Sequence, residues 1–448
     1  MKALRSHQLA CLLSAIVIAA GSRLVAANWP QWRGPQGQGI SVETSLPTEW
    51  SPTSHIKWKA AIAGRGHSAP VVWGDRVFLT TAVEGDVVPG HKAPVHMMGA
   101  EPFLHPDSMG VDRRNTLKVM ALDAATGRVL WEQVAYDGPM YDNRHKRSSY
   151  ASTTPVTDGE RVFVHFGAEG VYAYDVAGKL AWKAEVGKLK TLGLGIGASP
   201  ILYRDLLILQ CDDNMAADSF VVALDKRTGK EVWRTKRDVQ VSWSTPVLVE
   251  VPAAGATPAR TELVTNGSEW IVAYEPATGK ELWRTGGVKS NAIHTPLVGE
   301  GLVIATAGFP ERRVIAIRPG GAPKSDAERV AWTYDKGTAY VVSPILYQGF
   351  VYLLNDRGVI TTLDAKTGTV VYEGGRIPKP ATFMGSPVAF GDHVLLTSED
   401  GETFFIKAGA THAIAHTNSI DEPVYSSLAL ANGHIYIRGE RHLYAIGR

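Results

Sequence analysis

The sequence has 448 residues, of which 45% are hydrophobic and 20% are charged, and its formal net charge is +2. Acidic and basic residues are interspersed, so this charge gives no electrostatic argument for nucleic-acid binding. The hydrophobic content suffices for a large core, and no segment has the composition of a disordered chain. The 45 glycine residues favour an all-β chain with many turns.

Residues 1–27 are predicted to be a secretory signal peptide. Lys2 and Arg5 form a basic start, residues 9–20 form a short apolar core, and residues 25–27 form a small-residue cleavage site. The apolar run is too short to span a bilayer comfortably. We therefore expect an exported protein, periplasmic or extracellular, that is soluble, monomeric and without a transmembrane segment. Cys11 would leave with the signal, so Cys211 remains alone and no intrachain disulfide can form.

Residues 28–55 are rich in turn-forming residues and predict an irregular N-terminal arm. Residues 56–62 then predict a strand that has no hairpin partner of its own. Seven four-stranded units follow, each opened by small polar residues that usually precede proline. These openings lie at residues 68–70, 153–155, 199–200, 244–246, 294–296, 343–344 and 386–387. An eighth unit opens at Ser426 and stops one strand short.

One pattern recurs in these units: an alanine before an acidic residue, then a Thr-Gly turn, then a tryptophan. It predicts a β-hairpin in which glycine takes the positive-φ position of the turn and Asp or Thr caps the turn. A lone hairpin cannot bury its tryptophan, so neighbouring copies must stack. We expect the indole nitrogens of the repeated tryptophans to bond backbone carbonyls. The motif residues are Trp58, Trp131, Trp182, Trp233, Trp283, Trp332, Gly127, Gly229, Gly279 and Gly368.

Three copies depart from the pattern, and in one of them a residue is missing between Asp175 and Gly178. Tyr372 stands in a tryptophan position, and residues 318–329 insert an extra turn between Ala316 and Trp332.

The incomplete last unit predicts that the chain closes into a ring. Its three strands and the lone strand at residues 56–62 together make one complete blade, which leaves no unpaired sheet edge at the seam. The predicted fold is therefore an eight-bladed β-propeller of four-stranded antiparallel blades over residues 56–448. An open solenoid is the alternative, but it would need capping units that the sequence lacks.

The repeated hairpin pattern resembles the tryptophan docking motif of the pyrroloquinoline quinone (PQQ) propeller repeat family. The resemblance covers residues 56–448 and is specific for fold. Members of that family include quinoprotein alcohol and sugar dehydrogenases and non-catalytic scaffolds of the outer membrane. The opening pattern, the Lys-Arg-Ser-Ser-Tyr run at residues 146–150 and the closing His-Leu-Tyr-Ala-Ile-Gly are most similar to exported PQQ-like repeat proteins without an assigned reaction.

Two insertions, both in the first full blade, are the strongest candidates for a functional surface. They cover residues 83–115 and 137–149, and propeller topology puts both on one face beside the central funnel. Long loops on a rigid ring commonly carry binding residues. The alternative is that they pack on each other and on residues 28–54 as a lid without a ligand.

Residues near the strand openings should form the funnel wall, where an aromatic lining would suit a flat ligand such as a sugar or quinone or would simply plug the ring. Ser152 and Met384 also fall there. The predicted ligand-binding residues are His67, Arg144, His145, Arg147, Tyr150, Trp243, His294, Tyr340 and Tyr425.

Metal binding has weaker support. Acidic and amide residues such as Asp212, Asp213 and Asn214 could bind Ca²⁺, but they are also ordinary residues of tight turns. The histidines at positions 91, 96 and 105 lack zinc-type spacing. We predict no metal site from the residues themselves.

Two functions remain open. The favoured one is a non-catalytic binding or scaffold protein that engages a small molecule, a glycan or a partner protein through the funnel face. The alternative, implied by the resemblance, is a dehydrogenase that holds PQQ with Ca²⁺ and oxidises an alcohol or a sugar. The family's alcohol dehydrogenases use two adjacent cysteines, which this sequence lacks, whereas its sugar dehydrogenases do without them. No catalytic residue can be assigned.

Overall fold

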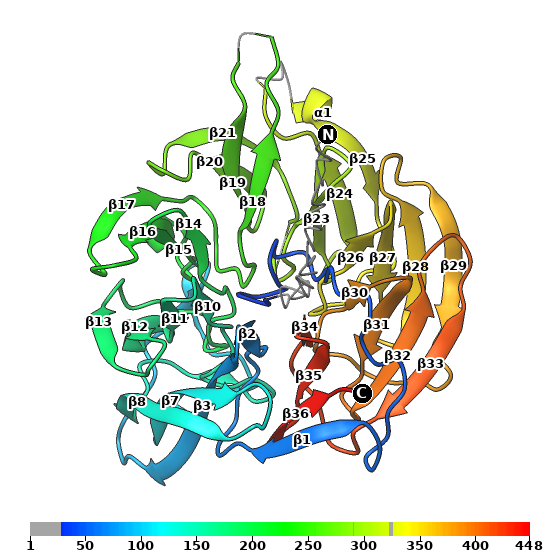
Figure 1. Cartoon of the computed structure of the whole chain (residues 1–448). Helices are drawn as coiled ribbons and strands as arrows, with labels where there is room; N and C mark the ends of the chain where they lie inside the picture. The colour runs from blue at the N-terminus through cyan, green and yellow to red at the C-terminus, as the bar shows by residue number, and fades with distance from the viewer. Residues whose placement is uncertain (1–27, 256, 290, 322–325) are drawn as a thin grey trace, which may run out of the picture.

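Eight four-stranded sheets surround a central axis in the computed structural model (Figure 1), as the sequence predicts. The structure describes residues 28–255, 257–289, 291–321 and 326–448. The predicted signal peptide at residues 1–27 lies outside this range. Within each sheet the neighbouring strands pair antiparallel. The strands also follow one another along the chain, except that the last sheet takes one strand from the N-terminal end. We number the sheets as blades 1 to 8 in chain order.

Blades 1 to 4 come from the first half of the chain. Blade 1 consists of β2 (Val71–Trp73), β3 (Arg76–Val87), β7 (Arg113–Asp123) and β8 (Val129–Pro139). Blade 2 consists of β10 (Val156–Thr157), β11 (Arg161–His165), β12 (Val171–Asp175) and β13 (Leu180–Ala184). Blade 3 consists of β14 (Ile201–Tyr203), β15 (Leu206–Cys211), β16 (Phe220–Asp225) and β17 (Glu231–Lys236). Blade 4 consists of β18 (Val247–Val251), β19 (Arg260–Asn266), β20 (Trp270–Tyr274) and β21 (Glu281–Gly286).

Blades 5 to 8 complete the ring. Blade 5 consists of β22 (Leu297–Gly299), β23 (Leu302–Ala307), β24 (Arg313–Ile317) and β25 (Val330–Tyr334). Blade 6 consists of β26 (Ile345–Tyr347), β27 (Phe350–Leu354), β28 (Val359–Asp364) and β29 (Val370–Arg376). Blade 7 consists of β30 (Val388–Phe390), β31 (His393–Thr397), β32 (Glu402–Lys407) and β33 (Ile414–Ser419). Blade 8 consists of β34 (Ala429–Ala431), β35 (His434–Arg438), β36 (His442–Ile446) and β1 (Ile56–Ala61).

Short elements lie outside the blades. The extra strands, all from the blade 1 insertions, are β4 (His96–Met98), β5 (Glu101–Phe103), β6 (Ser108–Met109) and β9 (Arg144–His145). The helical turns are η1 (Gly167–Glu169), η2 (Ala216–Asp218) and α1 (Asp326–Arg329). No helix of the described residues is long and apolar enough to cross a membrane.

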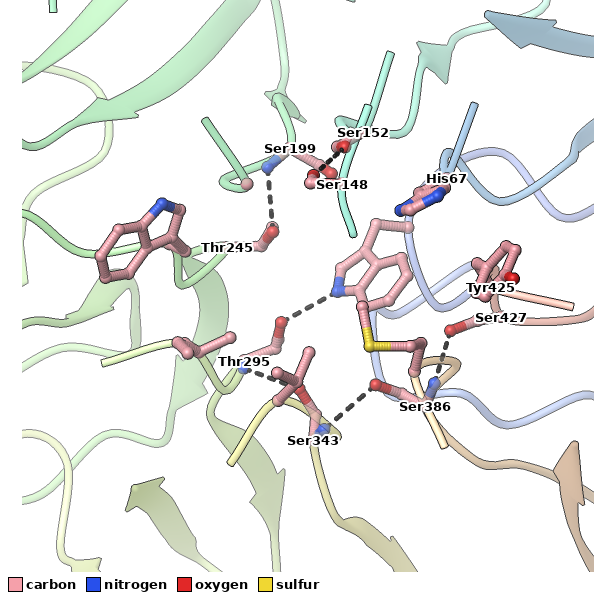
Figure 2. Close-up of a pocket in the computed structure, with 16 residues that line it drawn as sticks. His67, Ser148, Ser152, Ser199, Thr245, Thr295, Ser343, Ser386, Tyr425 and Ser427 are labelled. Carbon is pink, nitrogen blue, oxygen red and sulfur yellow. Dashed lines mark hydrogen bonds between the residues drawn. The ribbon is translucent and has the colours of Figure 1, made fainter. Parts of the chain in front are cut away.

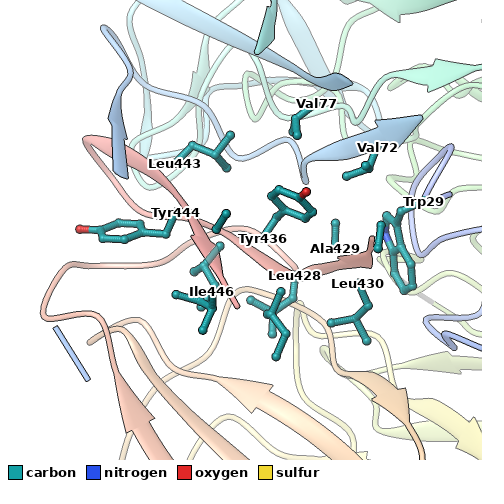
Figure 3. Close-up of a cluster of buried hydrophobic side chains, with 14 of the residues drawn as sticks. Trp29, Val72, Val77, Leu428, Ala429, Leu430, Tyr436, Leu443, Tyr444 and Ile446 are labelled. Carbon is teal, nitrogen blue, oxygen red and sulfur yellow. The ribbon is translucent and has the colours of Figure 1, made fainter. Parts of the chain in front are cut away.

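The ring is closed by β1, which pairs antiparallel with β36 and supplies the outermost strand of blade 8. Trp58 of β1 lies opposite Ala445, just as Trp131 of β8 lies opposite Ala121. The seam is filled by apolar side chains from blade 8, blade 1 and the arm (Figure 3), among them Trp29, which is fully buried. The two ends of the chain therefore share one core.

Neighbouring blades pack through the repeated tryptophans. The Trp182 indole lies against Gly229 of the next blade, where an added Cβ would come within 2.6 Å of the ring. Its Nε1 donates to the carbonyl of Lys226 at 3.0 Å. The same arrangement joins Trp58 to Gly127, Trp131 to Gly178, Trp233 to Gly279 and Trp332 to Gly368. The turn glycine is required because its φ is positive and because the indole occupies the space of a side chain.

Trp283 is the exception to the predicted bonding. Its Nε1 donates to the carboxylate of Glu262 at 2.8 Å and not to a backbone carbonyl. Blade 5 has no Thr-Gly turn at this point, and the Arg329 guanidinium lies 4.2 Å from the centre of the Trp283 ring. Glu262 also accepts the backbone N–H of Gly320. A carboxylate and a cation thus take over the contacts that a carbonyl and a glycine make elsewhere.

The two faces of the ring differ. Each innermost strand begins on the face that also carries the long insertions, which we call the insertion face, and ends on the opposite one, which we call the arm face. The arm, residues 28–55, crosses the ring centre and then runs outward to β1 (Figure 1). Its N-terminal end is fixed at the inner-strand turn of blade 1, where the Gly74 N–H donates to Asn28.

Candidate functional site

A small cavity of about 160 Å³ lies at the ring axis (Figure 2), where the innermost strands begin. Its wall contains serine and threonine hydroxyls from blades 3 to 8 together with aromatic side chains. The residues that line it are Trp32, His67, Ser148, Ser152, Gly197, Ser199, Trp243, Thr245, Ile293, Thr295, Val341, Ser343, Met384, Ser386, Tyr425 and Ser427.

The hydroxyls belong to a belt of hydrogen bonds that joins one blade to the next. The backbone N–H near the opening of one blade donates to the Ser or Thr hydroxyl at the opening of the next. These bonds run from Ala69 to Thr154, Thr154 to Ser199, Ser199 to Thr245, Thr295 to Ser343, Ser343 to Ser386 and Ser386 to Ser427, at 2.8 to 3.1 Å. This belt explains the small polar residue at six of the eight openings, those of blades 2, 3, 4, 6, 7 and 8. Because each hydroxyl oxygen accepts one bond, its own O–H remains to be donated.

The floor of the cavity is Trp32 of the arm, whose Nε1 donates to the Thr295 hydroxyl at 2.9 Å. Sequence reasoning missed this residue because the arm has no periodicity that would place it. The hydroxyl belt did have a sequence signal, because a serine or threonine recurs before each innermost strand.

Three of the predicted ligand-binding residues line the cavity: His67, Trp243 and Tyr425. The His67 and Tyr425 rings stack with their centroids 5.2 Å apart. The Trp243 indole is fixed by a 2.7 Å bond from Nε1 to the carbonyl of Gly195. Ser152 and Met384 also line the cavity, as expected of the funnel wall.

The environment of His67 carries positive charge. Burial, together with the nearby guanidinium groups of Arg65 and Arg438, lowers the pKa of His67 to about 3. The imidazole is therefore neutral at neutral pH and can act only as a neutral hydrogen-bonding ring.

The other predicted residues lie away from the cavity. His294 is fully buried, and its Nδ1 bonds the Thr306 hydroxyl at 2.7 Å. Tyr340 packs against Phe309, and its hydroxyl accepts a bond from Asn291. Tyr150 donates to the carbonyl of Asp142 at 3.0 Å and lines a neighbouring surface pocket.

The basic residues of the second insertion are bonded to carboxylates. Arg144 is buried and pairs with Glu84, and its guanidinium also lies over the Tyr150 ring. Arg147 pairs with Glu399 of blade 7, and His145 lies 3.5 Å from Asp107. Asp137 and Asp142, which lie in the same insertion, do not pair with these two arginines. The structure instead uses Asp137 for Arg114 and Asp142 for His96.

The two insertions pack on each other, because β6 of the first pairs with β9 of the second. Asp142 anchors them from below by accepting from the His96 ring at 2.9 Å. Asn214 of blade 3 bonds both backbone groups of Met97, which ties the β4–β5 hairpin to that blade. The insertions therefore form an ordered platform on the insertion face, whereas the arm crosses the ring on the arm face.

This platform is unusually apolar at its surface. Among the described residues, several of the exposed large hydrophobic side chains lie in residues 83–115. They are Val87, Val95, Met98, Leu104 and Met109, with exposed fractions from 44% to 68%.

The acidic side chains that the sequence offered as Ca²⁺ ligands are bonded to other groups of the protein. Asp212 is buried and pairs with Arg237 at 3.0 Å. Asp213 accepts the backbone N–H groups of Lys190 and Met215. Within the described ranges, no three His, Cys, Asp or Glu side chains are grouped so that they could hold a metal ion. Cys211 is buried, and burial raises its thiol pKa well above the usual range.

Comparisons with known proteins place this geometry in a family. The family model described as outer membrane protein assembly factor BamB matches residues 111–219 and 217–375. No curated protein matches the chain significantly. BamB from Moraxella catarrhalis aligns with a TM-score of 0.53 at 13% identity, over 82% of this chain and 99% of that one.

Two further structures align with this chain at low identity. The computationally designed Ika8 protein aligns with a TM-score of 0.55 at 11% identity, over 87% of this chain and 99% of its own. The quinohemoprotein alcohol dehydrogenase from Comamonas testosteroni aligns with a TM-score of 0.48 at 13% identity, over 94% and 81% of the two chains. Because the family model covers more than half of the sequence, the chain belongs to the family of BamB-like PQQ repeat propellers.

Proposed function

We propose that this protein is an exported, non-catalytic binding propeller that engages a partner protein or a ligand through its insertion face. The observation that carries this proposal is the concentration of exposed apolar side chains on the paired insertions of blade 1. Exposed apolar patches on an otherwise polar surface mark interaction sites, and methionine suits surfaces that adapt to a partner. The proposal that the protein is exported is based on the predicted signal peptide at residues 1–27.

The central cavity opens beside this platform and would add recognition of a small group. Its hydroxyls offer O–H donors, and the arginines around His67 make the region electropositive. Both features favour a group rich in acceptor oxygens, such as a carboxylate or a sugar. Arg144 and Arg147 remain proposed contacts, but an incoming anion would have to replace Glu84 or Glu399.

The lining of the central cavity does not fit PQQ and Ca²⁺. A volume of about 160 Å³ is below the roughly 300–1,000 Å³ of typical cofactor sites. The lining residues include no carboxylate, which a divalent calcium ion requires, and Trp32 of the arm closes the ring axis.

The proposal is tested by two matched pairs of substitutions at exposed apolar positions. Met98→Ser with Leu104→Ser changes the platform, and Val134→Ser with Val232→Ser changes outer strands of blades 1 and 3. All four side chains are more than half exposed, so neither pair should lower the melting temperature appreciably. We expect the platform pair alone to lose most of the interacting polypeptide that wild type retains from the host's cell-envelope fraction. Equal recovery with both pairs would contradict a binding role of the platform.

A further inference from the structure

The arm hydrogen-bonds to the innermost strands of most blades. These bonds show that the innermost strands can pair with an extended polypeptide at the ring centre. In blade 1, Trp29 and Val72 exchange both backbone bonds, at 2.8 and 2.9 Å. In blade 7, Ala389 donates to Gly39 and accepts from Ser41. Hydrogen bonds also reach four further blades. They include those from Thr157 of blade 2 to Pro30, from Val298 of blade 5 to Gln38, from Arg33 to Pro344 of blade 6 and from Ser41 to Leu430 of blade 8.

The same backbone positions recur in blades 3 and 4, at Leu202 and Leu248. In blade 3 a two-residue turn joins Tyr203 to Leu206, so these two residues form a hydrogen-bonded pair. Leu202, one residue earlier, then directs its N–H and C=O away from β15 and toward the ring centre, as Val72 does in blade 1. The pairing of Leu248 with Leu263 puts Leu248 in the equivalent position.

In the described part of the chain the arm makes no hydrogen bond to blade 3 or blade 4. A cavity of about 440 Å³ separates them instead, and we call it the arm-face slot. Trp32, Pro35 and Gln36 of the arm form one wall, and Leu202, Pro246 and Leu248 form the other. This volume lies within the range of ligand-binding sites.

We propose that the arm-face slot binds an extended segment of a partner polypeptide, which pairs with the backbone of Leu202 and Leu248. The arm is the precedent within this molecule, because an extended chain already fills the equivalent positions of blades 1 and 7. Recognition of this kind takes its affinity from main-chain bonds and its selectivity from adjoining side-chain sites.

The walls define the chemistry of this segment. Trp32, Pro35, Pro246 and the leucines favour an apolar or aromatic side chain. Glu250 is the one charged residue among those that line the slot, so an acidic segment is disfavoured and an uncharged or basic one is favoured. The slot lies on the arm face, so this inference does not depend on the function proposed for the insertion face.

The test uses the acetylated, amidated peptide Asn-Trp-Pro-Gln-Trp, which copies residues 28–32 and carries no charge. Hydrogen exchange by mass spectrometry on the full-length protein should show fast exchange of the Leu202 and Leu248 amides, which become protected when millimolar peptide is added. Segments around Val72 and Ala389 should be protected with or without it, because the arm already bonds them.

Two controls make the result decisive. N-methylation of the first tryptophan of the peptide removes the N–H that pairs in the arm and should weaken binding about tenfold. Gln36→Trp, which fills the slot, should abolish protection, whereas Val42→Trp, at an exposed arm residue outside it, should not. The proposal is overturned if the peptide gives no protection, if the N-methyl peptide binds equally well, or if Gln36→Trp leaves binding unchanged.

Discussion

At the scale of single residues, the stability of the ring depends on a tryptophan and a glycine that belong to different blades. The sequence predicted the stacking of copies, because a hairpin alone cannot cover an indole. It could not predict the partner of Trp283, since Glu262 lies in the preceding part of the same blade and carries no motif. It also did not reveal that the small polar residues at the blade openings bond to one another, because each bond joins residues more than 40 positions apart.

A comparison of Gly229→Ala with Gly433→Ala separates the two reasons for glycine in the turn, which are its positive φ and its contact with the indole. Both residues have positive φ, +73° and +71°, so each substitution should cost about 1–2 kcal/mol of backbone strain. Only Gly229 faces an indole, since nothing lies within 4 Å of a Cβ at Gly433. Overpacking against Trp182 should therefore add a further ~1–3 kcal/mol to the cost at Gly229. Urea unfolding of the two variants measures the difference, and equal losses would mean that the indole does not constrain the turn.

At the scale of elements, strand order was predictable and loop structure was not. Alternating apolar residues and turn glycines predicted the blades, and the missing last strand predicted the role of β1. The insertions were located correctly, but the pairing of β6 with β9 was not foreseen, because two residues on each side carry too little pattern. The path of the arm was also beyond prediction, since most of its bonds are made by backbone groups that any sequence offers.

Two truncations test the contribution of β1 to closure. Deleting residues 28–63 removes both the arm and β1, and it leaves the β36 edge of blade 8 unpaired. We expect a large fall in melting temperature together with aggregation through the exposed edge. Deleting residues 28–54 removes the arm but keeps β1, and should cause a smaller fall without aggregation. Closure by β1 would be contradicted if the longer truncation melted like the full chain.

At the scale of the whole molecule, the propeller presents two unlike faces around a plugged axis. The platform of insertions and the small central cavity lie on one side, and the arm and its slot lie on the other. The sequence predicted the closed eight-bladed ring and the face that carries the insertions. Only His67, Trp243 and Tyr425 of the predicted binding residues line the cavity, because sequence position near a strand opening does not determine which way a side chain points.

Site-specific photo-cross-linking from the platform tests the proposed binding role most directly. A photoreactive residue at Met98 should give a discrete adduct with one partner in the native cell envelope, whereas the same residue at Val232 should not. The two side chains are similarly exposed, at 56% and 52%, so chance collisions label them equally. A discrete adduct at Met98 alone is the result that the account predicts. No adduct at either position, or the same adducts at both, would contradict it.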